Sequence, residues 1–181
     1  MLLNPKRMYD QGVIFNVENI DVQLQQNGVD LRVLNIYELT SDGTIYKTKS
    51  VISDRQYLPA KNGFYTIIPG YYGVTFHEGV KLPSHVSAEI KVRSSLLRSG
   101  VIVKSGFFDS GFETEHAGCF LLALKNIKIE EDARVAQIVF FHSDSAKKYE
   151  GQWQGWYENN GKRRRCSVSY RTEDEVEISD S

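Results

Sequence analysis

The sequence predicts one mostly β domain, arranged as a barrel or a sandwich. Short apolar runs recur along the chain, and 14 Gly, 10 Tyr and 9 Phe residues punctuate or fill them, which favours strands over helices. At residues 86–92, apolar side chains alternate with polar and charged ones, at the period of two that is typical of a half-buried strand. A chain of 181 residues is long enough to bury a sizeable core without disulfides or metals.

The composition excludes several classes of protein. The 22 Lys and Arg residues almost balance the 23 Asp and Glu residues, so no overall electric field directs the chain to nucleic acid or to an anionic membrane. Its two cysteines, Cys119 and Cys166, cannot build a disulfide framework or a cysteine zinc site, which favours a reducing, cytoplasmic location. The longest apolar runs have strand length, and the N-terminus has no stretch resembling a signal peptide, so we expect no membrane contact.

The elements follow in order along the chain. A short helix is predicted at residues 5–11, because Asn4 can cap it and Pro5 suits the first helical position. A second helical turn is possible at residues 94–98. Turns are expected at Pro69-Gly70 and at residues 82–84. Strands are predicted at residues 29–37, 64–68, 73–76, 86–96, 100–103, 118–124 and 134–141.

The last residues differ in composition from the body. Residues 1–160 form the predicted β domain, whereas residues 161–181 combine a basic run with an acidic stretch and contain few apolar residues. Such a segment rarely packs as core, so we expect a mobile charged tail. Its basic run at residues 162–165 is either a solvated patch or a contact for phosphate.

Residues 93–98 carry the first candidate site. The sequence Arg93-Ser94-Ser95-Leu-Leu-Arg98 places two hydroxyls and two guanidiniums at the end of the clearest strand. These groups suit a polyanion such as a triphosphate, because guanidiniums and hydroxyls bind phosphate oxygens. The alternative is a serine that caps a helix beside surface arginines.

Three further segments offer candidate residues. Asp109 lies among aromatic residues between two glycines, where a carboxylate could activate water or could simply form a tight turn. Asp30 and Arg32 lie on the same side of a strand, either as a surface ion pair or as part of a metal–phosphate site. Residues 148–153 mix a cation, aromatic rings and an amide, as a nucleotide-covering flap or a polar loop would.

Other nucleotide and metal motifs are missing from the sequence. The four histidines are not spaced as a metal cluster, and no zinc-deaminase pattern occurs. The sequence also lacks the glycine-rich phosphate loop with its Lys and the dinucleotide-binding glycine fingerprint.

Five segments, taken together and in this order, resemble the dUTPase / dCTP deaminase superfamily. Residues 28–32 resemble its first motif, residues 93–98 match its RSSLxR signature, and residues 106–112 are similar to its G-[WVI]-[IV]-D-x-G-[FW] hairpin end. The run DARVAQIVF at 132–140 resembles the motif with R-[IV]-x-Q-[LI]. Residues 148–152 are similar to the KYxGQ flap of the deaminase branch. The resemblance covers roughly residues 10 to 155.

The resemblance implies a fold, an assembly and a ligand. It implies a distorted β-barrel and a homotrimer whose three active sites are shared between subunits. It also implies a deoxynucleoside triphosphate bound with Mg²⁺, with Asp30 near the metal–phosphate region. Asp109 is then the catalytic residue that orients the attacking water, and Phe112 stands where dUTPases carry a sugar-stacking Tyr. The resemblance further implies nucleotide-binding roles for Arg93, Ser94, Ser95, Arg98, Gln137, Lys148, Tyr149 and Gln152.

One departure from the family pattern separates the possible activities. The deaminase strand ends in a Glu that shuttles protons during attack on cytosine, and Ala123 occupies that position here. An alanine cannot transfer a proton, and loss of a general acid–base typically costs about 10²–10⁴-fold in rate. Glu113 or Glu115, in an inserted segment, would have to reach inward to replace it.

The leading hypothesis is therefore a Mg²⁺-dependent dUTP diphosphatase that releases dUMP and pyrophosphate. The alternatives are a dCTP deaminase or a related enzyme acting on a modified pyrimidine nucleotide, and a catalytically silent member that binds nucleotide or a protein partner. The dUTPase reaction does not need the missing Glu, because it uses the aspartate of the hairpin motif, which is present as Asp109.

Overall fold

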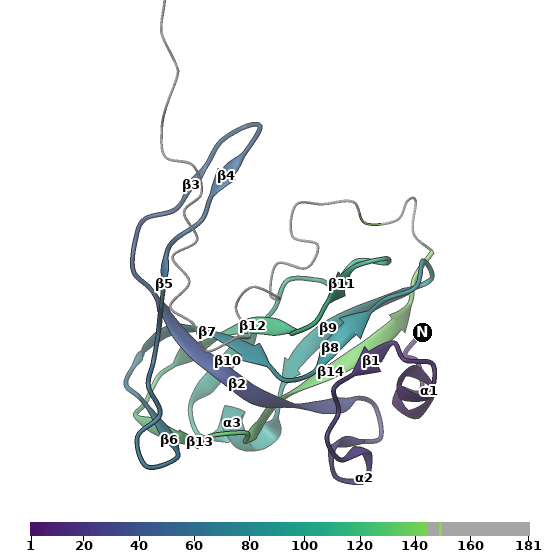
Figure 1. Cartoon of the computed structure of the whole chain (residues 1–181), viewed down its shortest axis with the longest axis horizontal. Coiled ribbons are helices and arrows are strands. Elements are labelled where there is room, and N and C mark those ends of the chain that lie inside the picture. Colours follow the sequence, from purple (N-terminus) through teal and green to yellow (C-terminus); the bar gives the residue numbers. More distant parts are fainter. Residues whose placement is uncertain (145–148, 150–181) are drawn as a thin grey trace, which may run out of the picture.

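The computed structural model describes residues 1–144 and residue 149. Its main sheet has the strand order β10-β12-β7-β2-β14-β9, and β5 pairs with β2 beside this path (Figure 1). All pairs in this sheet are antiparallel. Its strands are β2 (Val29–Leu39), β5 (Arg55–Tyr57), β7 (Gly70–Phe76), β9 (Val86–Val92), β10 (Val101–Lys104), β12 (Gly118–Ala123) and β14 (Arg134–His142).

The sheet curls into a nearly closed barrel because its two outer strands meet. The segment that follows β10 runs beside β9, where the backbones of Ala88 and Phe108 exchange hydrogen bonds of 3.0 and 2.9 Å. The hydroxyl of Ser105 also accepts a hydrogen bond of 3.1 Å from the Ile90 backbone N–H. The expected mostly β, barrel-like architecture is confirmed.

Shorter elements cover the ends of the barrel. A second sheet has the order β1-β8-β11, and two two-stranded sheets, β6 with β13 and β3 with β4, complete the described β structure. The β3–β4 pair projects from the barrel as an arm (Figure 1). These strands are β1 (Ile14–Phe15), β3 (Thr44–Ile45), β4 (Ser50–Val51), β6 (Phe64–Ile67), β8 (Gly79–Lys81), β11 (Glu113–Thr114) and β13 (Ile127–Glu130).

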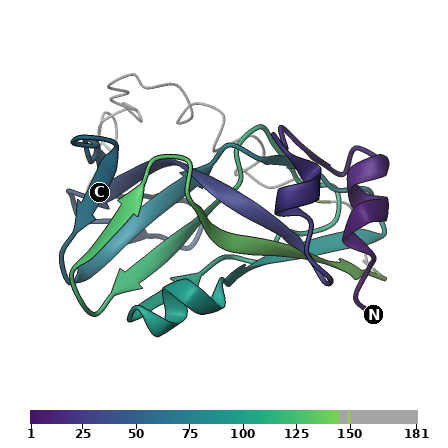
Figure 2. The same ribbon diagram turned by 90° about the horizontal axis from the view of Figure 1, so that it is seen from below.

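Three short helices flank the barrel. Helix α1 (Pro5–Asp10) begins as the sequence predicts, because the Asn4 side chain accepts hydrogen bonds from the first-turn N–H groups and Pro5 occupies the first turn. Helix α2 (Ile20–Gln23) follows, and both lie at one end of the barrel (Figure 2). Helix α3 (Ser94–Arg98) comes directly after β9.

The core is formed by the inward face of the main sheet. The predicted alternation along β9 holds in part: Lys91 is exposed, but Ser87 on the predicted polar face is buried, as are the apolar residues Val86, Ala88 and Ile90. Burial of such side chains supplies the main driving force for folding, since each large apolar side chain contributes about 1.5–3 kcal/mol. The largest fully buried apolar side chains include Phe76, Phe140, Ile14, Leu31, Ile36, Ile67, Leu121 and Ile138.

The predicted strand at residues 86–96 is wrong at its C-terminal end. Strand β9 ends at Val92. The pair of Val92 with Ala136 on β14 is the final pair along β9. Beyond this point one backbone hydrogen bond to β14 remains, from the Arg93 N–H to the Val135 C=O at 3.4 Å, and residues 94–98 form α3 instead. The possible helical turn at 94–98 is therefore confirmed.

The sequence also missed the short elements. Strands β1, β3, β4, β8 and β11 have two or three residues, and helix α2 has four, which is too short for a periodic pattern to appear. The predicted strands at 29–37 and 73–76 are each longer in the structure, because β2 continues into its pairing with β5 and β7 begins at Gly70 opposite Ala123. In residues 1–144, no helix is long and apolar enough to cross a membrane. The tail at 161–181 lies outside the described residues.

Candidate functional site

The first part of the site is built by the register of three neighbouring strands. β14 lies between β2 and β9, and Gln137 on β14 faces Asp30 on β2 and Lys91 on β9. Arg93 follows the end of β9, so the pairing brings its side chain to the same place. We call Asp30, Arg93, Arg134 and Gln137 the arginine group.

Asp30 is the centre of the arginine group. Its side chain is fully buried, and its Oδ2 lies 3.2 Å from Arg93 Nε and 3.3 Å from Arg134 Nη1. The Gln137 amide donates to the other oxygen, Oδ1, at 3.3 Å. Both oxygens of the carboxylate are thus hydrogen-bonded, which satisfies a buried charge.

Opposing effects act on the ionisation of Asp30. Burial raises the pKa of Asp30 above its ordinary value, and the Arg93 guanidinium, the Gln137 amide and the Arg134 guanidinium counteract this rise. The carboxylate and the two arginines therefore depend on one another: the cations stabilise the buried negative charge, and the carboxylate holds the cations.

The prediction that Asp30 and Arg32 form a surface ion pair is wrong. Asp30 is buried in the arginine group, whereas Arg32 Nε lies 2.8 Å from the buried carboxylate of Glu78. Arg32 also pairs with Glu18 at 2.7 Å, and Gln23 donates to Glu78 at 2.7 Å. This second network ties the segment around α2 to the barrel.

The predicted phosphate-binding residues of α3 are on the surface. Ser94, Ser95 and Arg98 are all exposed, and Arg93 is partly buried at the N-terminal edge of the helix. The Ser94 and Ser95 hydroxyls do not cap the helix, because its N-cap residue is Arg93, which makes no side-chain capping bond. The structure thus leaves both hydroxyls accessible to a ligand.

The second part of the site is the hairpin end, residues 106–112. Its turn is closed by a backbone hydrogen bond of 3.1 Å from Phe112 N–H to Asp109 C=O. Gly111 has φ of +86°, a left-handed conformation that a glycine adopts without strain. The turn leaves Asp109 exposed while Phe108 and Phe112 are buried beneath it.

Aromatic rings surround the hairpin end. The Phe112 ring lies 5.4 Å from that of Phe108 and 5.5 Å from that of Tyr149, the latter in an edge-to-face arrangement. The Tyr149 N–H also donates to the Ser110 carbonyl at 2.8 Å. Tyr149 is thereby held against the hairpin end that carries Asp109. The other two predicted flap residues, Lys148 and Gln152, lie outside the described residues.

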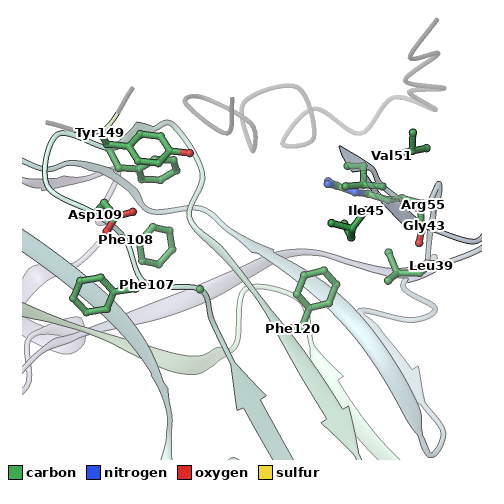
Figure 3. A pocket seen from close by; sticks show the side chains of 14 residues that line it. Leu39, Gly43, Ile45, Val51, Arg55, Phe107, Phe108, Asp109, Phe120 and Tyr149 are labelled. Carbon is green, nitrogen blue, oxygen red and sulfur yellow. The ribbon is translucent and has the colours of Figure 1, made fainter. Parts of the chain in front are cut away.

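A cavity of about 550 Å³ opens between the hairpin end and the β3–β4 arm. Figure 3 shows Asp109, Phe107, Phe108 and Tyr149 on one side of it, Arg55 and the arm residues on the other, and Phe120 between them. Asp109 is the one carboxylate among its described lining residues. These are Leu39, Gly43, Ile45, Val51, Ile52, Ser53, Arg55, Gly106, Phe107, Phe108, Asp109, Phe112, Phe120 and Tyr149.

The two parts of the site are separated within one chain. Phe108 pairs with Ala88 near the start of β9, whereas Arg93 lies five residues further along, a rise of about 17 Å at roughly 3.3 Å per residue. None of Arg93, Ser94, Ser95, Arg98 or Gln137 lines the cavity that contains Asp109. The structure thus brings the predicted residues together in two groups rather than one.

Comparison with known proteins identifies the family of this chain. The family model described as dCTP deaminase-like matches residues 5–143, which is most of the chain. The chain belongs to the dCTP deaminase-like family. The resemblance seen in the sequence motifs is therefore confirmed.

Relatives of this family member carry dUTP nucleotidohydrolase names. The probable deoxyuridine 5'-triphosphate nucleotidohydrolase of Halobacterium salinarum is 33% identical over 156 residues, covering 81% of this chain and 94% of the relative. The deoxyuridine 5'-triphosphate nucleotidohydrolase of Methanocaldococcus jannaschii is also 33% identical, over 143 residues, covering 74% of this chain and 88% of the relative.

The fold of this family member is also seen in a solved structure. The 2'-deoxycytidine 5'-triphosphate deaminase of Agrobacterium tumefaciens superposes with a TM-score of 0.59 at 18% identity. The match covers 78% of this chain but 48% of that deaminase chain. At this identity the likeness supports the shared fold alone.

Ala123, which the sequence resemblance predicts at the position of the deaminase glutamate, is buried in this family member. Ala123 is 2% exposed at the end of β12 and pairs with Gly70 and Val101. Neither candidate replacement lines the cavity: Glu113 pairs with Lys81 at 3.0 Å, and Glu115 is exposed. The condition for a replacement proton carrier, that Glu113 or Glu115 reaches inward, is therefore not met in this structure.

A protein-built magnesium site does not fit the described residues. No group of three or more His, Cys, Asp and Glu side chains in that part of the chain could hold a metal ion. The Asp30 carboxylate is already shared by two guanidiniums and an amide. The role of Asp30 as a direct metal ligand therefore remains a prediction, and the described residues form no ligand set around it.

Sequence reasoning missed two cationic residues of the site. Arg134 stands in the run DARVAQIVF that carries Gln137, so the motif itself could have indicated it. Arg55 lines the cavity, with its guanidinium 4.8 Å from the centre of the Tyr37 ring. No sequence motif surrounds Arg55, because its place depends on the pairing of β5 with β2.

Proposed function

We propose that this protein is a dUTP diphosphatase that hydrolyses dUTP to dUMP and pyrophosphate. The observation that carries the proposal is the chemistry of the cavity, whose described lining offers one carboxylate, Asp109, among aromatic rings. Hydrolysis of a triphosphate needs one such base, whereas deamination by this family needs an additional glutamate, and a buried alanine, Ala123, stands at that position. The names of the relatives at 33% identity support the same activity.

In the proposed reaction, Asp109 orients a water molecule and accepts its proton. The water oxygen forms a bond to the α-phosphorus while the bond from that phosphorus to the bridging oxygen of the β-phosphate breaks. The bridging oxygen keeps the electron pair and leaves as part of pyrophosphate. Guanidiniums that contact the phosphate chain lower the free energy of the transition state, because they neutralise its developing negative charge. We propose this role for Arg93. Further phosphate ligands would be Ser94, Ser95, Arg98 and Gln137.

We propose that Mg²⁺ enters with the nucleotide, because the described residues form no protein-built site for it. When bound to phosphate oxygens, Mg²⁺ supplies neutralisation of their negative charge. The chain's own contribution would be to bind the phosphate chain through the arginine group.

The separation of the two parts supports a shared site between subunits. Within one chain, about 17 Å of strand β9 separates the partner of the hairpin end from Arg93. One α-phosphate cannot meet both groups of the same chain without a large rearrangement. We therefore propose a homotrimer in which the hairpin end of one subunit meets the arginine group of its neighbour, in a soluble protein of the cytoplasm.

The test is incubation of the purified protein with dUTP, dCTP, dTTP and UTP in the presence of Mg²⁺, with the products separated by chromatography. We expect dUMP and pyrophosphate from dUTP alone. Conversion of dCTP to dUTP without pyrophosphate would instead establish a deaminase, the second candidate, which the dCTP deaminase-like family match favours. Nucleotide binding without any product would indicate the third, a silent member.

The assembly has its own measurement. Sedimentation equilibrium should give three times the chain mass of 20.7 kDa. Mixing an inactive Asp109→Asn protein with an inactive Arg93→Ala protein, after subunit exchange, should restore part of the activity, because some sites then combine an intact hairpin end with an intact arginine group. A monomer with full activity would contradict the shared site.

A further inference from the structure

We propose that Arg134 binds the triphosphate beside Arg93, and that Asp30 is the positioning residue that holds both guanidiniums. This inference rests on the proposed function for the triphosphate ligand. It adds a phosphate-binding residue, Arg134, to those that the sequence motifs indicate. It also gives Asp30 a role that requires no metal.

The first step concerns the place of Asp30. Its carboxylate is fully buried, and one oxygen, Oδ2, is shared between Arg93 Nε at 3.2 Å and Arg134 Nη1 at 3.3 Å. The backbone of Asp30 is held as well, because Gln23 Nε2 donates to its carbonyl at 2.9 Å. A buried carboxylate fixed at both its main chain and its side chain defines where the two cations lie.

The second step concerns the arginines themselves. Arg93 Nη1 also donates to the Arg134 carbonyl at 2.7 Å, and Arg134 Nη1 donates to the Val22 carbonyl. Each guanidinium is therefore held at two points and loses little further freedom when it binds a ligand. Their side chains are nevertheless 30% and 32% exposed, so part of each remains accessible.

The third step concerns charge. Two guanidiniums share one carboxylate, so the group keeps a net positive charge even when Asp30 is ionised. Arg98, Ser94 and Ser95 are exposed on the adjoining helix and add a cation and two hydroxyls. This surface suits a polyanion such as a triphosphate. A divalent cation, in contrast, would have to displace both guanidiniums to reach the carboxylate.

The binding test uses a dUTP analogue with an imido link between the α- and β-phosphates. Its affinity is measured by calorimetry in EDTA and again in Mg²⁺, for the wild type, Arg134→Gln, Asp30→Asn and the double variant. Arg7→Gln is the matched control, because Arg7 is an exposed arginine of α1 outside the site. Circular dichroism verifies that each variant is folded.

We expect Arg134→Gln to weaken binding by roughly tenfold or more in both solutions, since a charge-assisted hydrogen bond to phosphate is lost. Arg7→Gln should bind as the wild type does. Asp30→Asn should also weaken binding in both solutions, and Arg134→Gln should add little in the Asp30→Asn background, because Asp30 acts through the arginines. Wild-type affinity in Arg134→Gln, or a loss in Asp30→Asn that occurs only with Mg²⁺, would overturn the proposal.

A second measurement needs neither nucleotide nor a variant of Asp30. In ¹⁵N NMR spectra of the wild type, the Arg93 Nε–H should exchange with water more slowly than the Arg7 Nε–H, because Arg93 Nε is ion-paired with the buried Asp30 carboxylate at 3.2 Å. Equal exchange rates would overturn the positioning role of Asp30. If the wild type bound no triphosphate, the proposed function and the role of Arg134 would both fall, while the exchange rates would still decide the role of Asp30.

Discussion

Gln137 on β14 stands directly opposite Asp30 on β2, and its Nε2 lies 3.3 Å from Asp30 Oδ1. This cross-strand pair joins a residue of one sequence motif to a residue of another, 107 positions apart. The pairing of β14 with β9 on its other side then brings Arg93 to the same carboxylate. The register of one central strand thus assembles the arginine group.

Replacing Gln137 by Met should weaken nucleotide binding by roughly tenfold, because it removes an amide that contacts Asp30 and, in the proposed site, a phosphate. Met keeps a similar volume, but it leaves the buried Asp30 Oδ1 without this hydrogen bond, so the free energy of unfolding should also fall by about 1–3 kcal/mol. Calorimetry with the imido analogue of dUTP measures the change. Gln56→Met, at an exposed position of β5, serves as control, and equal affinities in the two variants would restrict Gln137 to a structural contact.

Asp109→Asn should lower kcat for dUTP hydrolysis by about 10²–10⁴-fold, because an amide cannot accept the proton of the attacking water. Affinity for the imido analogue should be nearly unchanged, since Asn keeps the shape and the turn of the hairpin end. Product formation and binding are measured separately. Asp10→Asn, at an exposed surface pair with Lys6, should leave both values at the wild-type level. Near-normal turnover in Asp109→Asn would contradict the catalytic role.

Gly28→Ala should lower the free energy of unfolding by about 1–3 kcal/mol, the usual cost of overpacking. A Cβ atom at Gly28 would lie 2.4 Å from the Ile138 carbonyl oxygen and 2.7 Å from Gln137 Cγ, so β2 and β14 would have to separate. Gly106→Ala is the matched control, because no atom lies within 4 Å of its added Cβ. Urea denaturation of both variants gives the comparison, and equal stability would show that the two strands can adjust.

Cys119 should react very slowly with iodoacetamide in the folded protein. Burial raises the pKa of its thiol, and the reactive thiolate is therefore scarce. Because the pKa lies well above this range, the thiolate fraction should rise by about tenfold per pH unit, so increasing the pH from 7 to 9 should accelerate the reaction by roughly 100-fold, more than for an ordinary cysteine, while the rate itself stays far lower. The measurement uses a Cys166→Ser background, so that Cys119 is the only thiol. Labelling in urea should be rapid, and equally rapid labelling without urea would indicate frequent opening of β12.

The sequence by itself determined the fold class and indicated several of the candidate site residues. Alternation at Val86, Ala88 and Ile90 predicts a strand with one buried face because the side chains of a strand point alternately to its two sides. Asn4 and Pro5 predict the start of α1 because their side chains act on the adjacent backbone. Likewise, Asp109 and Gly111 lie in one continuous turn, whose conformation depends on neighbouring residues.

The tertiary structure decided which of these residues meet. Strand β9 ends at Val92 because its pairing with β14 ends there. The register of three strands decides that Asp30 contacts Arg93 and Arg134 rather than Arg32. The cavity likewise requires the arm to lie across from the hairpin end. Strand pairing depends on contacts between residues far apart in the chain. A local pattern of amino acids therefore does not indicate which distant strand will pair with it.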